Sequence, residues 1–291
     1  MFNNVKLGIA PIGWTNDDMP QLGGELTFEQ MVSEAALAGF QGKFPTDPAV
    51  LNKALDLRGI KIASQWFSSF LCSTPYEENE KAFIEQLDFL EAVGASRINV
   101  CELTRCLFAE ECSMFGDNKP IATDEEWDKL CDGLNKLGKI AADRGFKLCF
   151  HHHMATVVQT FEETKRLMDN TDPRYVYLCF DTGHFTFSKE DAVKAAKEFG
   201  PRIGHVHLKD IRPDMMEKAY AEGFKFRKAV LEGCFTIPGD GCVDYPGVFK
   251  ALHDAHYEGW FIVEAEQDPA KANPLEYAKM AREYIKKTAG I

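Results

Sequence analysis

The segment VYLCFDTGHF, residues 176–185, is a continuous apolar run that ends in ionisable side chains. A strand that is apolar along its whole length is typical of a parallel sheet with helices packed on its faces. Comparable runs recur at VKLGIAPIGW (5–14), AGFQGKF (38–44, the weakest), IKIASQWF (60–67), RINVCE (97–102), KLCFHHH (147–153), IGHVHLKD (203–210) and WFIVEAE (260–266). The sequence therefore predicts eight parallel strands.

Amphipathic segments with helix-start and helix-stop signals separate these strands. Thr27 and Gln30 have the spacing of a capping box, and Gly39 lies where that helix would end. Another predicted helix begins after Thr123, has acidic residues in its first turn and stops at Gly145. Eight strands alternating with helices in 291 residues favour a closed α/β barrel, the (β/α)8 TIM barrel, over an open doubly wound sheet.

The organisation of the chain supports one barrel rather than two domains. The stretch GIAPIGW lacks the GxGxxG motif that a dinucleotide-binding fold places after its first strand. We expect one catalytic TIM-barrel domain over residues 1–291, because no linker or low-complexity stretch interrupts the chain. The longest connection, residues 211–243, contains a helical piece and the turn-rich IPGDG, and is predicted to form a lid or rim of the active site.

The composition limits the partners and the location. No run reaches the roughly 18 apolar residues that a membrane-spanning helix needs, and the N-terminus lacks the features of a signal peptide. The net charge of −12 opposes binding to nucleic-acid phosphates. Nine cysteines without a CxxC pair suit a reducing compartment. We expect a cytoplasmic protein that binds neither nucleic acid nor membrane, and leave a homo-oligomer open.

Most of the histidines gather near predicted strand ends, which converge on the active-site face of a barrel. With their neighbouring carboxylates they are His151, His152, His153, His184, His205, His207, Asp181, Glu264 and Glu266. Strand alternation lets His151 and His153 share one face, and the same holds for His205 and His207. Such a mixed set suits Mn²⁺, Co²⁺, Fe²⁺ or Zn²⁺ better than Ca²⁺. The sequence predicts a divalent metal site.

Several of these motifs resemble a known family. FDTGH, HVHLKD and GWFIVEAE resemble the strand-end motifs of the xylose-isomerase-like barrel superfamily. Within it, GIAPIGWTNDDMP, FHHHMATVVQT, the TIPGDGCVDY loop and VEAEQDPAKANPLEYA resemble the inosose dehydratases of myo-inositol catabolism. The likeness runs from about residue 5 to the C-terminus.

The resemblance implies a metal-dependent lyase that dehydrates 2-keto-myo-inositol (scyllo-inosose) to 3D-trihydroxycyclohexane-1,2-dione. It places the metal, with Mn²⁺ or Co²⁺ expected, on His151, Asp181, His207 and Glu264, with Glu266 as the alternative to Glu264. Either glutamate is a candidate base for the proton next to the ketone, and His153 or His184 is a candidate acid for the leaving hydroxyl. The other interpretation of His184 is a partner that holds Asp181 in place.

Further polar residues at strand ends are expected to bind the polyol: Trp14, Asn16, Asp17, Glu102, Lys209 and Asp210. Trp14 can stack on an apolar ring face. The alternative is that Asn16 and Asp17 only cap their loop. Lys209 and Asp210 can instead form an internal ion pair at the barrel rim.

One stretch departs from the family pattern. AGFQGKFPTDP, residues 38–48, lacks the strand-2 glutamate and its neighbours that relatives carry there. The alternative enzyme is a ketose epimerase or isomerase on the same barrel. A multi-metal endonuclease for abasic DNA is disfavoured by the net charge of −12, and a non-catalytic sugar-binding barrel leaves the polar strand ends unexplained.

Overall fold

The eight predicted strands form one curled parallel sheet in the computed structural model, which describes residues 2–16, 19–39, 41–42 and 47–291. The sheet order is β2-β1-β10-β7-β6-β5-β4-β3, and the strand pairings among the described residues are all parallel. Its strands are β1 (Val5–Ile9), β2 (Gln41–Gly42), β3 (Gln65–Ser69), β4 (Arg97–Glu102), β5 (Lys147–His151), β6 (Val176–Asp181), β7 (Ile203–Leu208) and β10 (Gly259–Val263). The predicted TIM barrel is confirmed.

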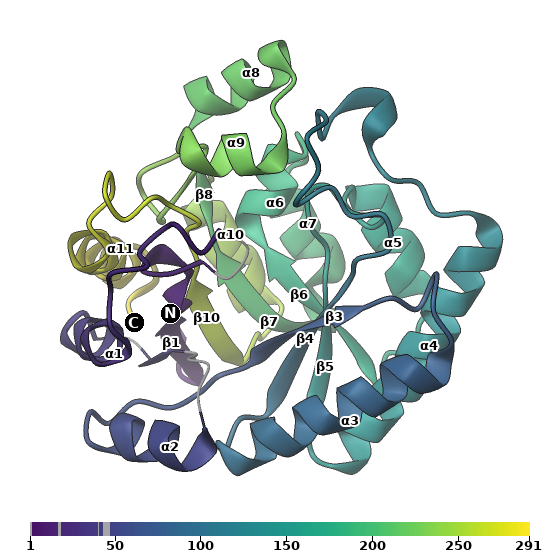
Figure 1. Cartoon of the computed structure of the whole chain (residues 1–291), viewed down its shortest axis with the longest axis horizontal. Helices are drawn as coiled ribbons and strands as arrows, with labels where there is room; N and C mark the ends of the chain where they lie inside the picture. Colours follow the sequence, from purple (N-terminus) through teal and green to yellow (C-terminus); the bar gives the residue numbers. More distant parts are fainter. Residues whose placement is uncertain (1, 17–18, 40, 43–46) are drawn as a thin grey trace.

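Helices surround this sheet on its outside, as Figure 1 shows. The outer helices are α1 (Phe28–Leu37), α2 (Pro48–Asp56), α3 (Tyr76–Ala92), α4 (Asp124–Asp143), α5 (Phe161–Asp169), α7 (Ala192–Phe199), α10 (Tyr245–Asp254) and α11 (Pro274–Ala289). Their apolar faces and the outward faces of the strands share the main hydrophobic core. No helix in the described part of the chain is long and apolar enough to cross a membrane.

Helix caps confirm part of the predicted start signals. Thr123 and Glu126 form a complete capping box at the start of α4. At α1 only half of the predicted box forms: the Thr27 side chain accepts from the Gln30 backbone N–H, but the Gln30 side chain donates to Glu34 instead. Hydrogen bonding between Gln30 and Glu34 one turn apart therefore replaces the reciprocal cap.

Except for β4, the strands are shorter than the apolar runs that predicted them. The run 176–185 leaves the sheet at Asp181, whose carboxylate oxygen Oδ1 accepts the His184 backbone N–H at 2.9 Å and caps the short helix α6 (Thr182–Phe187). His184 therefore lies on a helix and not on a strand. The run 60–67 enters the sheet only at Gln65.

Residues 211–243 build an extra layer on the barrel rim, visible at the top of Figure 1. The layer contains α8 (Pro213–Glu222), α9 (Phe226–Leu231) and an antiparallel pair of β8 (Asp210–Ile211) and β9 (Phe235–Thr236). A second apolar cluster lies under it, including Met154, Phe187 and Phe235. This segment is thus packed onto the site's rim, as predicted.

Candidate active site

Four neighbouring strands carry the predicted metal ligands to one point at the top of the barrel. His151 ends β5, Asp181 ends β6, His207 is in β7, and Glu264 follows β10. These strands are adjacent in the sheet, and Asp181 and His207 are register partners. Strand alternation turns all four side chains toward the barrel axis.

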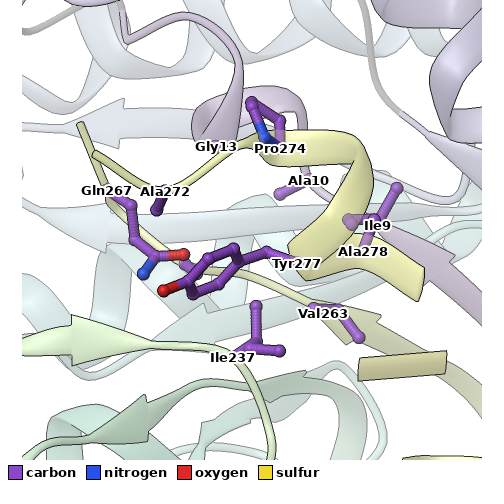
Figure 2. Close-up of a pocket in the computed structure, with 11 residues that line it drawn as sticks. Ile9, Ala10, Gly13, Ile237, Val263, Gln267, Ala272, Pro274, Tyr277 and Ala278 are labelled. Carbon is purple, nitrogen blue, oxygen red and sulfur yellow. The ribbon is translucent and has the colours of Figure 1, made fainter. Parts of the chain in front are cut away.

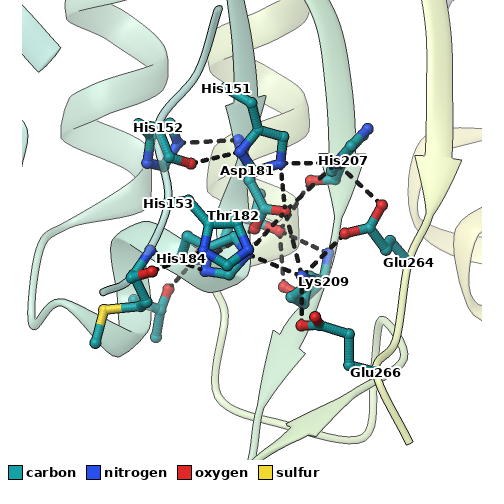
Figure 3. A network of polar contacts seen from close by, with 12 residues as sticks. His151, His152, His153, Asp181, Thr182, His184, His207, Lys209, Glu264 and Glu266 are labelled. Carbon is teal, nitrogen blue, oxygen red and sulfur yellow. Dashed lines mark hydrogen bonds and ion pairs between the residues drawn. The ribbon is translucent and has the colours of Figure 1, made fainter. Parts of the chain in front are cut away.

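The ligand atoms lie within a few ångströms of one another (Figure 3). The Nε2 atom of His151 is 3.6 Å from Oδ2 of Asp181 and 3.0 Å from Nδ1 of His207. That Nδ1 is 3.6 Å from Oδ2 of Asp181 and 3.2 Å from Oε2 of Glu264. Two nitrogens and two carboxylates in this arrangement make a donor set for a first-row divalent cation.

Two hydrogen-bonding details fit a bound cation. The Nδ1 atom of His151 contacts the carbonyl oxygen of His152 at 2.5 Å, so Nδ1 carries the proton and the lone pair of Nε2 points into the site. Burial lowers the pKa of His151, which keeps the ring neutral as a ligand must be. The Oδ2 atom of Asp181 is fully buried and has no hydrogen-bond partner among the described residues. Such an orphaned acceptor is explained if it faces a cation.

The charges of the buried cluster also fit a divalent cation. The ammonium of Lys209 is fully buried and lies 3.0 Å from Glu264, 3.0 Å from Glu266 and 3.8 Å from Asp181. Burial opposes its charge, but Glu266 and Glu264 raise the pKa of Lys209 overall. Three carboxylates and one ammonium leave a net charge of −2, which a divalent cation would neutralise.

The two glutamates differ in their surroundings. Burial disfavours the charged form of Glu264, but His207 and Lys209 lower its pKa to about 2. Burial raises the pKa of Glu266, although Lys209 opposes the shift. Glu264 contacts His207, a predicted metal ligand. Glu266 instead accepts a hydrogen bond from Lys209. Of the two glutamates, Glu264 is thus the one that lies against another predicted ligand.

Two more residues could hold a cation, and the sequence prediction did not name them as ligands. One group of donor atoms within 4.8 Å of each other joins His184 to His151, Asp181 and Glu264. Another joins Cys179 to His151 and His207. Cys179 lies two residues before Asp181 and therefore on the same face of the strand.

The candidate acids His153 and His184 lie against each other, with ring centres 3.6 Å apart. The Nδ1 atom of His153 is 2.7 Å from the carbonyl oxygen of Met154, which leaves its Nε2 for another partner. The Nε2 atom of His184 faces the ammonium of Lys209 at 2.9 Å. Burial lowers the pKa of both rings.

An aromatic wall, which sequence reasoning missed, surrounds His153. Its members are Trp66, Phe108 and Phe226, with ring centres 5.9, 4.5 and 5.5 Å from that of His153. Trp66 was detectable, because it alternates with Phe67 on a predicted strand. Phe108 and Phe226 come from long loops and helices, and no sequence periodicity places them here.

The expected polyol-binding residues fall into two groups. Lys209 lies inside the charged cluster. Trp14 is buried and its Nε1 donates to Glu34, while Oδ1 of Asn16 accepts the Met19 backbone N–H at 3.1 Å. The latter contact matches the loop-capping alternative for Asn16. Asp17 lies outside the described residues.

Glu102 and Asp210 are both satisfied by loop groups. Glu102 accepts from the Ser69 hydroxyl and from the backbone N–H groups of Leu71 and Thr104. Asp210 accepts backbone N–H groups from three rim residues, Ile211, Gly239 and Val243. Burial raises the pKa of both carboxyls.

The alternative ion pair between Lys209 and Asp210 does not occur: the carboxylates within 4.0 Å of the Lys209 ammonium in the described chain are Asp181, Glu264 and Glu266. Substrate binding by Glu102 and Asp210 stays a prediction. The effect of the missing strand-2 glutamate also stays open, because residues 43–46 are outside the described part.

A small cavity near β1 and β10 is not a substrate site (Figure 2). Its volume is about 20 Å³, and its walls are mostly apolar, including Ile9, Val263 and Tyr277 of α11. A single water molecule needs ~10–15 Å³, so a cyclohexane ring does not fit.

Comparison with known sequences supports the family resemblance. The family described as xylose isomerase-like TIM barrel matches residues 28–288. The inosose dehydratase of Geobacillus thermodenitrificans is 54% identical over 294 residues, which cover 99% of both chains. The inosose dehydratase of Clostridium beijerinckii is 55% identical over 292 residues, covering 99% of this chain and 98% of the relative.

Solved structures of low sequence identity share the fold. The IOLI protein with a binding zinc atom superposes with a TM-score of 0.71 at 16% identity, over 98% of each chain. The D-allulose 3-epimerase from Methylomonas sp. in complex with D-allulose has a TM-score of 0.69 at 19% identity, over 98% of this chain and 97% of that one. At such identities the likeness extends to the barrel and no further.

Proposed function

We propose, since this chain belongs to the xylose isomerase-like TIM barrel family and within it to the inosose dehydratases, that it is a hydro-lyase acting on inosose. The reaction removes water from 2-keto-myo-inositol (scyllo-inosose) and gives 3D-trihydroxycyclohexane-1,2-dione. The observation that carries this proposal is the meeting of His151, Asp181, His207 and Glu264 around the buried ammonium of Lys209.

His151, Asp181, His207 and Glu264 would hold a divalent cation, Mn²⁺ or Co²⁺ in our proposal. When bound, the cation supplies a Lewis acid beside the ketone. The neutral His151 supports this assignment, and so does Oδ2 of Asp181, which accepts no hydrogen bond from the described residues. Lys209 would hold Glu264 and Glu266 in place beside each other by pairing with one oxygen of each.

Glu266 is the proposed base for the proton on the carbon next to the ketone. Glu266 is 5% exposed, and its carboxylate accepts a hydrogen bond from Lys209. It faces the site but is not one of the proposed metal ligands. A positioned carboxylate in a water-poor site is a suitable base for such a proton. Glu264 is instead committed to His207 and Lys209.

His153 is the proposed donor to the leaving hydroxyl, with His184 behind it. The contact of its Nδ1 with the Met154 carbonyl fixes the ring and places the proton of the neutral form on Nδ1, so Nε2 donates only after the ring has taken up a second proton. His184 Nε2 faces the Lys209 ammonium, which disfavours a second positive charge there. Trp66, Phe108 and Phe226 would cover an apolar face of the cyclohexane ring and exclude water.

The remaining sequence predictions stay predictions: a cytoplasmic location, no nucleic-acid partner, a homo-oligomer, and one domain over residues 1–291. None of them is needed for the reaction.

The test is product formation by protein loaded with Mn²⁺ or Co²⁺. Samples are incubated separately with inosose, a ketose panel and abasic DNA, with the Asp181→Asn variant as the inactive control. We expect dione absorbance from inosose, and neither epimerised ketose nor cleaved DNA. Faster formation of an epimer than of the dione would overturn the proposal in favour of the epimerase alternative.

A further inference from the structure

Asn99 is a buried amide in the middle of β4 that faces the barrel interior. Its Nδ2 atom lies 3.2 Å from Nε2 of His207 and 3.2 Å from Oγ of Ser64. Its Oδ1 atom has no hydrogen-bond partner in the part of the chain that the structure describes, although Asn99 is only 3% exposed. A buried acceptor without a partner beside a candidate ligand needs a physical reason.

The two ring nitrogens of His207 face different groups. Nδ1 faces Nε2 of His151 at 3.0 Å, Glu264 at 3.2 Å and Asp181 at 3.6 Å, whereas Nε2 faces Asn99. A neutral imidazole has one N–H donor and one lone pair. In the arrangement of the structure, Nδ1–H donates to Nε2 of His151, beside Glu264, and Nε2 accepts from Nδ2 of Asn99. This arrangement satisfies His207 without a cation.

A cation held by Nδ1 of His207 requires the opposite tautomer. Nδ1 must then offer its lone pair, and the proton must sit on Nε2. Nδ2 of Asn99 would face another N–H group, which leaves two buried donors opposed. A half-turn of the amide exchanges Oδ1 and Nδ2, whose positions are nearly equal in shape. Oδ1 then accepts from Nε2 of His207 and from the Ser64 hydroxyl.

We propose that Asn99 is a positioning residue that selects the metal-binding tautomer of His207 by turning its Oδ1 toward Nε2. An amide suits this place because it can donate to one tautomer and accept from the other. Aspartate only accepts, and leucine does neither. The inference rests on the metal centre of the proposed function.

The test measures the Kd of Mn²⁺ alone, by competition with a chelating dye at pH 8, in Asn99→Leu and Asn99→Asp. Loss of a hydrogen-bond partner of a metal ligand weakens metal binding by about 10–100-fold, which is the result expected for Asn99→Leu. Asn99→Asp should bind at least as tightly as the wild type, because its carboxylate accepts the Nε2 proton. ¹⁵N NMR of histidine in the zinc-loaded wild type should show His207 protonated at Nε2.

A matched control separates this role from general stability. Asn79→Leu removes another buried amide, which lies on α3. Its oxygen accepts the Phe70 backbone N–H, and its nitrogen donates to the Thr74 hydroxyl, both in the loop before that helix. It should lower the melting temperature and leave the Kd of Mn²⁺ unchanged.

Wild-type affinity in Asn99→Leu, or equal weakening in Asn99→Asp, would overturn the inference. If Asn99→Leu does not fold, zinc-loaded wild type with His207 protonated at Nδ1 would overturn it as well. The Asp181→Asn variant separates an error in the proposed metal centre from an error in the proposed role of Asn99. Retained Mn²⁺ in that variant means that the metal centre itself is wrong. Lost Mn²⁺ there, together with wild-type affinity in Asn99→Leu, means that only the role of Asn99 is wrong.

Discussion

The ends of β4 and β6 each carry a fully buried carboxylate, Glu102 and Asp181, but the two are used differently. Both oxygens of Glu102 accept hydrogen bonds from the loops after β3 and β4. One oxygen of Asp181 caps α6, and the other has no hydrogen-bond partner among the described residues. Glu102 thus joins two loops, whereas one oxygen of Asp181 accepts nothing from the described residues.

The pKa directions follow the same difference. Burial raises the pKa of Glu102, although its hydrogen bonds from Thr104, Ser69 and Leu71 oppose the shift. Burial also opposes the charge of Asp181, but His184 and Lys209 hold the pKa of that carboxyl well below its usual range. A buried carboxylate at a strand end is thus a candidate functional residue when cationic groups lie beside it and one of its oxygens accepts no hydrogen bond from the described residues. Burial alone does not distinguish the two.

Asp181→Asn is the most direct test of the difference between Asp181 and Glu102, and it has the largest expected effect. The amide keeps the cap on α6 through its oxygen but removes one negative charge from the ligand set. We expect loss of tight Mn²⁺ or Co²⁺ binding and of dione formation, with the barrel still folded by circular dichroism. Elemental analysis that finds one bound metal per chain would show that Asp181 is structural, like Glu102.

A second substitution asks which histidine beside Asp181 moves a proton. His153→Ala is expected to slow dehydration by ~10²-fold, the usual scale for losing a general acid, with metal content unchanged. His184→Ala, measured separately, should act mainly through Lys209 and Asp181 and so alter metal content too. An unchanged kcat in His153→Ala, beside a slowed His184→Ala with its metal intact, would reverse the two roles.

Asn16 resembles Glu102, because its Oδ1 already accepts a hydrogen bond from a loop N–H. Asn16→Ala is still predicted to raise KM for inosose several-fold, since a lost hydrogen bond is worth about 1 kcal/mol. Steady-state kinetics at full metal loading measures the effect. An unaltered kcat/KM would make Asn16 a loop cap only.

Glu102→Gln has the smallest expected effect on chemistry and is the matched control for Asp181→Asn. The glutamine oxygen can still accept, but its NH₂ group opposes a backbone N–H. We expect a loss of about 1–3 kcal/mol in the free energy of unfolding, by denaturant titration, with metal content and KM unchanged. A raised KM at normal stability would restore Glu102 to the substrate-binding residues.

Periodicity was enough to predict the barrel, because strand alternation and helix capping are local properties. The apolar runs, Thr123 and Gly145 identify elements without knowledge of their neighbours. Strand boundaries were less exact: only the fold shows that Asp181 stops β6 by capping α6. The half-formed cap at Thr27 likewise depends on Glu34 competing for Gln30.

The sequence by itself determined the fold class and the kinds of donor at the strand ends, because residue type and spacing decide which side chains a buried strand turns inward. Only the tertiary structure decided what each donor faces. It satisfied Glu102, left Oδ2 of Asp181 without a hydrogen-bond donor among the described residues, set Lys209 among three carboxylates and brought Phe226 to His153. These contacts join residues far apart in the chain, so the free energy of each depends on positions that no local pattern encodes.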